Sequence, residues 1–257
     1  MEQTPLLDFR QVGLQYPSRT GAVQALTDVS LTIQAGEFIC VVGPSGCGKT
    51  SLLRMIAGFQ FPTTGVALID GQAISGPGAD RGMVFQQPAL YPWLSLEDNI
   101  AFGPRMRGIT AQHRAERTRA LLELVGLAEF GQRAPYELSG GMQQRAAIAR
   151  VLINEPRIML MDEPFGALDA LTREHMQEEL LKIWRATQTT IILITHSVEE
   201  AIYLGTRTVV MSARPGRIVA DVATLFSRSA GDSRAIKSRA DFVHTREAVL
   251  NYIWRQS

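Results

Sequence analysis

Short apolar runs alternate along the chain with stretches in which apolar and polar residues mix. Unbroken runs of this length are typical of strands buried on both faces of a sheet. The unbroken apolar runs are residues 38–42, 83–85, 158–161 and 190–195. Residues 6–16 and 26–34 instead approach a strict alternation, which indicates half-exposed antiparallel strands. The pattern therefore predicts an α/β fold in which an antiparallel sheet accompanies a buried parallel one.

Residues 95–153 differ from the rest because their apolar positions follow helical spacing. Gly and Thr at the ends of these segments are suitable caps. The predicted helices of this part are residues 96–102, 110–125 and 140–153. Elsewhere the pattern predicts helices at 51–57, 173–185 and 241–254, a turn at 17–24, a strand at 66–70 and a closing hairpin from 206–212 and 217–224. A helical part is thus expected between strands of the main sheet.

Composition limits the class of protein without naming it. The 257 residues are 46 % hydrophobic, enough for a full core, and the net charge of +1 gives no support to a nucleic-acid partner. No apolar stretch approaches the length of about 18 residues that crosses a bilayer, and the N-terminus lacks signal-peptide features. Two cysteines give no disulfide framework. We expect a soluble cytosolic protein that is still able to dock on a membrane partner.

The apolar run at 38–42 leads directly into a glycine-rich segment. This segment fits the pattern G-x-x-x-x-G-K-[ST], and a predicted helix beginning at Ser51 follows it. Its residues are Gly43, Pro44, Ser45, Gly46, Cys47, Gly48, Lys49 and Thr50. Glycines let backbone N–H groups point at phosphate oxygens, Lys49 adds a positive charge, and the Thr50 hydroxyl is placed to bind Mg²⁺. The alternative is an ordinary glycine-rich turn between a strand and a helix.

Polar side chains also follow three other predicted strands. Gln86 follows one, Asp162 and Glu163 another, and His196 a third. The carboxyl ends of parallel strands meet at one edge of a sheet, where ligands bind. We therefore expect Asp162 to hold the metal's water shell, Glu163 to accept a proton from an attacking water, and His196 to reach a γ-phosphate. Gln86 can reach a metal or a water with its amide. The alternative for the carboxylates is a strand that ends in solvated acids.

Three further features have both a functional and an ordinary interpretation. Ser139 is a plausible N-cap, and Gly140 and Gly141 would leave the first N–H groups of a helix open to an anion, although such helix starts are common. Tyr16 has a ring suited to stacking on adenine, or else it packs at the rim of the sheet. Tyr91 and Trp93 form either a docking patch or an ordinary anchor for their loop.

Taken together, these motifs resemble the nucleotide-binding subunit of an ABC transporter. The segments that carry the resemblance are GPSGCGKT, Gln86, LSGGMQQR, IMLMDEP, GALD with Asp169, and His196. Their order and spacing match over nearly the whole chain. The segments GPGADRGMVFQ, PFGALDALTR and RAIKSRADF resemble the importer branch for nitrate, sulfonates and taurine. One departure is Met142, which stands where many relatives have glutamine.

The resemblance implies a P-loop NTPase (RecA-like) core with an antiparallel β subdomain and an inserted α-helical subdomain. The core and β subdomain would be residues 1–94 and 154–224, the helical subdomain residues 95–153, and the tail residues 225–257. The resemblance also implies an ATPase with ATP and Mg²⁺ as cofactors. The implied metal ligands are Thr50, Gln86 and Asp162; the implied catalytic residues are Glu163, His196, Lys49 and Gln86; and Ser51 and Asp169 join the nucleotide site.

The resemblance further implies partners and a location. Two copies would face head to tail, with ATP between the phosphate loop (residues 43–50) of one copy and residues 139–141 of the other. Gln86 would relay to two membrane permease subunits through residues 87–93, and a solute-binding protein would act indirectly. The chain would lie on the cytoplasmic face of the membrane as a peripheral subunit. It would energise uptake of a small anionic solute such as nitrate, a sulfonate or taurine.

Two alternatives come from other classes of protein. One is a soluble ABC-type ATPase that acts on nucleic acid or on the translation machinery. Such proteins tend to carry tandem cassettes, coiled-coil insertions or basic extensions, and this sequence has none of these features. The other is a P-loop kinase, which does not account for LSGG or for His196.

Overall fold

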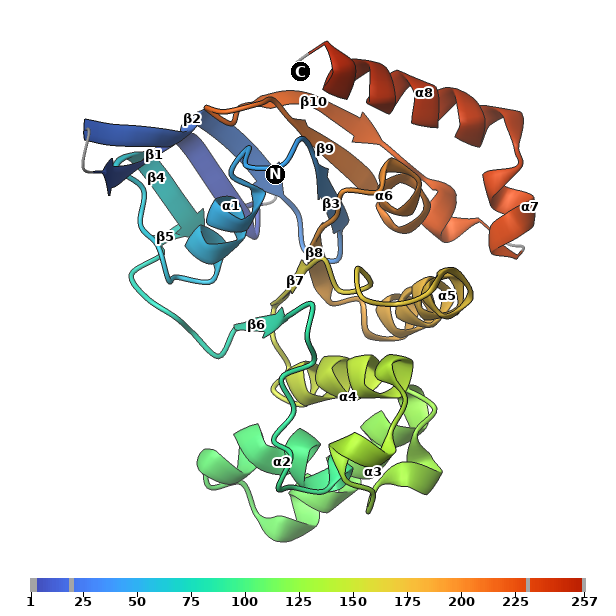
Figure 1. Cartoon of the computed structure of the whole chain (residues 1–257). Helices are drawn as coiled ribbons and strands as arrows, with labels where there is room; N and C mark the ends of the chain where they lie inside the picture. The colour runs from blue at the N-terminus through green and yellow to red at the C-terminus, as the bar shows by residue number, and fades with distance from the viewer. Residues whose placement is uncertain (1–3, 19–20, 230–231, 256–257) are drawn as a thin grey trace. The chain divides into compact units, whose positions relative to one another are not determined.

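The computed structural model describes residues 4–18, 21–229 and 232–255 and divides into two compact units (Figure 1). Unit 1 contains residues 1–78 and 188–257, and unit 2 contains residues 79–187. The phosphate loop and His196 belong to unit 1, whereas Gln86, Ser139 and Glu163 belong to unit 2. The three-part division predicted from the sequence stays a prediction.

Unit 1 contains a four-stranded antiparallel sheet in the order β2-β1-β4-β5. Its strands are β1 (Leu7–Ser18), β2 (Gly21–Ile33), β4 (Thr64–Ile69) and β5 (Gln72–Ala73). The alternating pattern predicted both long strands, but the predicted turn at 17–24 is wrong on either side of residues 19–20, which lie outside the described residues. Pro17 pairs with Ala22 and Tyr16 with Val23, so the ladder continues where the polar composition indicated a loop.

The parallel strands of unit 1 form its buried centre. In this part of unit 1, β3 (Phe38–Val42) lies between β8 (Thr190–Ile194) and β9 (Arg207–Met211) and is parallel to both, and β10 (Ile218–Ala223) pairs antiparallel with β9. Every residue of β3 and β8 is buried. These two unbroken apolar runs are thus explained by burial on both faces. The run at 83–85 differs, because only Val84 is buried and Phe85 is 44 % exposed.

Helices and one 3₁₀ turn complete unit 1. They are α1 (Lys49–Ile56), α6 (Val198–Leu204), η3 (Phe226–Arg228), α7 (Ser233–Lys237) and α8 (Ala240–Trp254). In Figure 1, α8 lies along β10, and it also contacts α6 and β9, with Phe242 and Val249 fully buried. The helix α7 was not predicted, because residues 227–240 are mostly polar. Asp232 begins this helix by accepting a hydrogen bond from the N–H of Ala235 at 2.7 Å.

Unit 2 joins one pair of parallel strands to a group of helices. Its strands are β6 (Arg81–Val84) and β7 (Ile158–Asp162). Its helices are α2 (Leu96–Met106), η1 (Ala128–Phe130), η2 (Pro135–Glu137), α3 (Ala111–Leu124), α4 (Gly140–Leu152) and α5 (Ala170–Thr187). The helices α2, α3 and α4 pack together, as Figure 1 shows in green. The helices predicted between residues 95 and 153 are confirmed.

Candidate functional site

The phosphate loop connects β3 to α1 and curls around the side chain of Lys49. Its ammonium group donates hydrogen bonds to the backbone carbonyls of Gly43 at 2.8 Å and Pro44 at 3.0 Å. Gly46 and Gly48 have φ angles of 75° and 97°, in the left-handed region that favours glycine. A buried strand, a glycine turn and a helix N-terminus thus surround one cation. Backbone N–H groups and a lysine ammonium are groups that bind phosphate oxygens, so this loop is suited to hold a polyphosphate.

Close packing leaves no room for side chains at two of the loop glycines. A Cβ atom on Gly43 would lie 2.7 Å from the carbonyl oxygen of Met211, and one on Gly48 would lie 2.6 Å from Leu26. Cys47, between them, is fully buried. The loop therefore rests directly on neighbouring strands of unit 1.

Tyr16 lies on β1, 35 residues before its contact on α1. Its hydroxyl forms a hydrogen bond of 3.1 Å with the hydroxyl of Ser51. Tyr16 is half-buried, so part of its surface remains open beside the first turn of the helix that follows the phosphate loop. The sequence predicted an aromatic surface here but not the bond that holds it.

His196 follows β8 at the same edge of the parallel sheet as the phosphate loop. Val41 and Ile194 are paired in the ladder, and the N–H of Thr195 donates to the carbonyl of Val41 at 3.2 Å. His196 itself is exposed. Strand register therefore brings the histidine and the loop to one edge of unit 1, as the parallel arrangement predicted.

In unit 2 the carboxylates and Gln86 also lie at one strand edge. Val84 pairs with Met161, so Asp162 at the end of β7 and Gln86 just beyond β6 lie at the ends of neighbouring strands. A Cβ atom on Gly166 would lie 2.9 Å from the amide nitrogen of Gln86, which places this side chain against the turn after Glu163. Glu163 has a φ angle of 48°, a left-handed conformation that non-glycine residues rarely adopt and that clusters at functional sites.

The serine and glycines at 139–141 begin α4. The Ser139 hydroxyl accepts a hydrogen bond from the N–H of Met142 at 3.4 Å and leaves both glycines at the helix start. Further along α4, Gln144 donates to the carbonyl of Phe85 at 3.3 Å, directly before Gln86. The helix that carries the predicted anion site is therefore bonded to the loop that carries Gln86.

The turn with Asp169 lies against this helix start. A Cβ atom on Gly140 would lie 3.6 Å from Leu168, and one on Gly141 would lie 3.2 Å from Thr172. The N–H of Thr172 donates to Asp169 at 3.0 Å. Hydrogen bonds from the backbone and hydroxyl of Thr172 lower the pKa of the Asp169 carboxyl, so this exposed group stays ionised.

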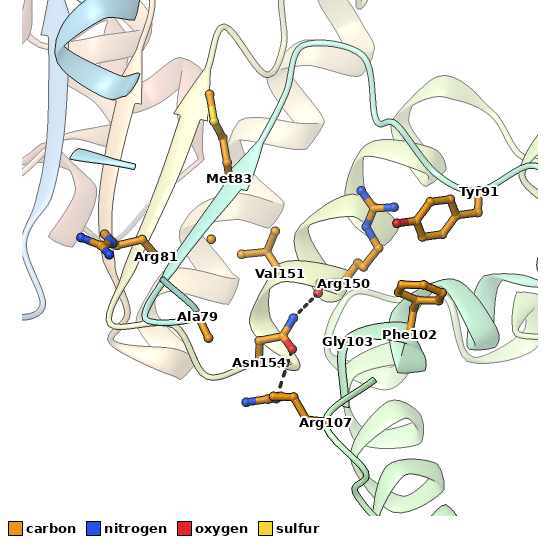
Figure 2. A pocket seen from close by; sticks show the side chains of 11 residues that line it. Ala79, Arg81, Met83, Tyr91, Phe102, Gly103, Arg107, Arg150, Val151 and Asn154 are labelled. Atoms are coloured by element: carbon orange, nitrogen blue, oxygen red, sulfur yellow. Dashed lines mark hydrogen bonds between the residues drawn. The ribbon is translucent and has the colours of Figure 1, made fainter. Parts of the chain in front are cut away.

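Unit 2 also contains a cavity of about 440 Å³ that the sequence pattern does not predict (Figure 2). Its lining comes from β6, the loop 85–95, α2 and α4, and includes Arg81, Arg107, Arg150, Tyr91 and Phe102. The lining carries no acidic residue. Because these residues are distant in sequence, only the packing of the helices brings them together.

Tyr91 organises one wall of this cavity. Its ring lies 4.8 Å from that of Phe102 and 5.4 Å from that of Trp93, and the guanidinium of Arg150 lies 5.4 Å from its centre. The side-chain amide of Asn99 accepts a hydrogen bond from the N–H of Tyr91 at 2.7 Å and donates one to the carbonyl of Tyr91 at 3.0 Å. Burial lowers the pKa of the Arg150 guanidinium. Tyr91 is thus an anchor of its loop, whereas Trp93 is 76 % exposed.

The predicted site residues thus form two groups, each brought together within its own unit. The group of unit 1 comprises Tyr16, the loop 43–50, Ser51 and His196. The group of unit 2 comprises Gln86, Ser139, Gly140, Gly141, Asp162, Glu163 and Asp169. Among the described residues, no helix combines the length and hydrophobicity needed to cross a bilayer.

The sequence is similar to curated proteins over nearly its whole length. The ABC transporter family matches residues 26–166. A taurine import ATP-binding protein of Roseobacter denitrificans is 55 % identical over 90 % of this chain and 87 % of its own length. Proteins of the same name from Jannaschia and Burkholderia pseudomallei are 54 % and 50 % identical over 96 % of this chain, and over 94 % and 96 % of their own lengths.

Solved structures agree with this similarity. The dimeric structure of the ATP-binding cassette MJ0796, bound to ADP and phosphate, matches with a TM-score of 0.72 at 31 % identity, over 85 % of this chain and 98 % of its own. The protein cbiO1 of Clostridium perfringens matches with a TM-score of 0.80 over 95 % of this chain and all of its own; at 24 % identity it shows the fold alone.

The comparisons confirm the fold class and the family that the motifs resemble. The predicted α/β fold with a P-loop NTPase core is that of the matching cassettes. Nothing in the comparisons supports the alternative of a non-transport ATPase, since the curated relatives are named as import proteins. The chain therefore belongs to the ABC transporter family, and within that family it is an ATP-binding subunit.

Proposed function

We propose that this chain is the ATP-hydrolysing subunit of an importer for taurine. The observation that carries the proposal is the identity of about half of all positions with taurine import ATP-binding proteins, over nearly the full length of both chains. A phosphate loop closed around Lys49 supports the ATPase part of the proposal.

Within unit 1, the proposed role of the site is to bind the nucleotide. Lys49 and the backbone N–H groups of residues 45–51 hold the phosphates, because a helix N-terminus and a cation both favour negative charge. Tyr16 stacks on adenine with the part of its ring that remains open, while Ser51 holds its hydroxyl. His196 holds the γ-phosphate from the neighbouring strand.

Within unit 2, the proposed role of the site is to hydrolyse the nucleotide. Glu163 accepts the proton of the attacking water, and its left-handed backbone and the contact of Gln86 with the turn support a fixed position. Thr50 from unit 1 and Gln86 and Asp162 from unit 2 are the proposed ligands of Mg²⁺, consistent with the preference of this ion for oxygen donors. When bound, the ion supplies charge neutralisation at the phosphates.

The proposed partner at the start of α4 is a second copy of the chain. Ser139, Gly140 and Gly141 bind the γ-phosphate held by that copy, and the nearby Asp169 faces the same nucleotide. The support is the start of α4, where Ser139 caps the helix and the two glycines leave its first N–H groups uncovered. ATP then links the two copies head to tail.

The proposed partners at the membrane are two permease subunits, which place the chain at the cytoplasmic face. We propose that the cavity beside Tyr91 receives a permease segment and that the loop 87–93 carries the signal between Gln86 and the membrane. The support is an exposed Trp93 beside a cavity whose wall is aromatic. A solute-binding protein that carries taurine acts from the other side.

Reconstitution with the permease and the solute-binding protein of a taurine importer from the same cell tests the proposal. Vesicles that contain the complex and internal Mg-ATP should take up labelled taurine, and taurine-loaded binding protein should raise the ATPase rate. The matched control is the Glu163→Gln subunit, which should bind ATP but support no uptake. Uptake of another anion in preference to taurine would overturn the substrate, and an ATPase that never responds to the permease would overturn the role.

A further inference from the structure

The strands β9 and β10 form a hairpin whose tip lies at the phosphate loop. Val42 pairs with Val210, so the strand β9 ends at the same edge as β3. Residues 212–217 form the tip, and its position next to the loop is fixed by backbone contacts. A Cβ atom on Gly216 would lie only 2.0 Å from the carbonyl oxygen of Cys47. The tip and the phosphate loop are therefore in direct contact within unit 1.

Hydrogen bonds on both sides hold this tip in place. The N–H of Gly216 donates to the carbonyl of Ala25 at 2.9 Å, and the N–H of Thr27 donates to the carbonyl of Gly216 at 3.0 Å. Within the tip, the Ser212 hydroxyl accepts from the N–H of Arg217 at 3.0 Å. These bonds tie the tip to β2 and close it on itself, so the residue at its apex has a defined position.

That residue is Arg214, whose guanidinium lies beside the middle of the phosphate loop. Its Nη2 atom is 4.0 Å from the position that a Cβ atom of Gly46 would take, and no other atom outside the neighbouring residues comes within 4 Å of that position. Arg214 is exposed. A second cation therefore stands next to a loop that already surrounds the ammonium of Lys49.

Arg214 differs in its partners from Arg207, the arginine with which β9 begins. Arg207 is held by Glu37 at 2.9 Å and also by Asp221. Arg214 has no such ion pair with any residue that the structure describes. A guanidinium next to a phosphate-binding loop, with its donors open, is suited to bind phosphate oxygens, often through two hydrogen bonds at once.

We propose that Arg214 binds the terminal phosphates of the nucleotide held by the phosphate loop of the same chain. The inference rests on the proposed ATP binding and adds a residue that lies outside all the motifs identified in the sequence. The guanidinium reaches the phosphates from the hairpin, on the outer side of the loop, while Lys49 acts from within it. Gly216 and Gly46 serve this contact because neither carries a side chain between the hairpin and the loop.

Nucleotide affinities of Arg214→Ala and Arg214→Lys test the proposal. Titration calorimetry in the Glu163→Gln background measures binding of Mg-ATP, Mg-ADP and AMP without hydrolysis. Loss of one charged hydrogen bond at an exposed position should weaken Mg-ATP binding about tenfold. The loss should be smaller for Mg-ADP and absent for AMP, and it should shrink in high salt. Arg214→Lys should recover part of the affinity, because it keeps the charge.

Two controls separate phosphate binding from a purely structural role. Arg255→Ala removes the same charge from the end of α8 and should leave all three affinities unchanged. Thermal unfolding without nucleotide should be the same for Arg214→Ala and its parent. An equal loss of affinity for all three nucleotides, or unchanged affinity for Mg-ATP, would overturn the inference. If the parent chain itself binds no ATP, the proposed function fails with it.

Discussion

The two units hold their site residues by different physical means. In unit 1 the phosphate loop rests on backbone: carbonyls of Met211 and Cys47 lie where side chains of Gly43 and Gly216 would be. In unit 2 the equivalent edge is held by side chains, since Gln144 bonds Phe85 and Gln86 lies against the turn at Gly166. Close backbone contact leaves few alternative arrangements, whereas side-chain bonds beside a cavity of about 440 Å³ permit adjustment.

This difference fits a division of labour between binding and response. A loop that must place several N–H groups around phosphates benefits from rigidity. An edge with the proposed roles of sensing a nucleotide and facing a membrane partner needs two arrangements. On this account, substitutions in unit 1 change affinity, and substitutions in unit 2 change turnover or coupling.

The largest expected effect breaks the chemistry of unit 2 and spares the binding of unit 1. Glu163→Gln keeps the shape and a hydrogen-bonding group but removes the proposed general base, a loss that typically costs about 10²–10⁴-fold in rate. We expect that reduction in steady-state ATPase activity with nearly unchanged affinity for Mg-ATP. Near-normal turnover would show that another group accepts the proton.

The next effect tests the backbone packing of unit 1. Gly216→Ala would force a Cβ atom against the carbonyl of Cys47, and such overpacking costs about 1–3 kcal/mol. If that cost falls on the nucleotide-binding state, affinity for Mg-ATP drops about 5- to 150-fold. Gly76→Ala is the control, because a Cβ atom there meets nothing within 4 Å. Equal affinity in both variants would contradict the rigid-loop account.

A smaller effect tests the aromatic side of the cavity in unit 2. Trp93→Ala removes a ring that is 76 % exposed, so the stability of the chain should change little. Truncating an aromatic residue in an interface often costs more than 1 kcal/mol, so affinity for the permease should fall about tenfold while basal ATPase activity is kept. Trp254→Ala, at a ring that is 66 % exposed on α8, is the control and should bind the permease normally. Unchanged permease affinity in Trp93→Ala would place the docking surface elsewhere.

The smallest effect concerns the aromatic surface of unit 1. Stacking contributes about 0.5–1.5 kcal/mol, so Tyr16→Ala should weaken ATP binding several-fold. Tyr16→Phe keeps the ring and loses only the bond to Ser51, so it should stay close to the unsubstituted chain. Equal affinities measured by calorimetry for both variants would reject the stacking role.

The sequence predicted what depends on local pattern and strand order. Unbroken apolar runs marked β3, β7 and β8, and the polar residues after them lie at the strand edges where parallel pairing requires them. The segment 17–24 was misjudged, because Pro17 and neighbouring polar residues resemble a turn although they continue a hairpin ladder. Local composition cannot reveal pairing with a partner strand.

The rest depended on contacts between residues far apart in sequence. Nothing near Gly216 indicates that it packs on Cys47, about 170 residues earlier, and nothing near Arg150 indicates a shared cavity with Tyr91. The left-handed backbone of Glu163 is likewise invisible in a pattern of residue types. Motifs identified the chemistry of the site, and tertiary packing supplied the hairpin and the cavity.

The most direct test of the account is size-exclusion chromatography of Glu163→Gln with and without Mg-ATP. If unit 1 binds the nucleotide and the start of α4 in a second copy completes the site, blocked hydrolysis should shift the chain from monomer to dimer. The double variant Glu163→Gln, Ser139→Arg should bind ATP and stay monomeric, because the larger side chain fills the open helix start. A dimer that persists in the double variant, or a Glu163→Gln chain that binds Mg-ATP tightly and remains a monomer, would contradict the account.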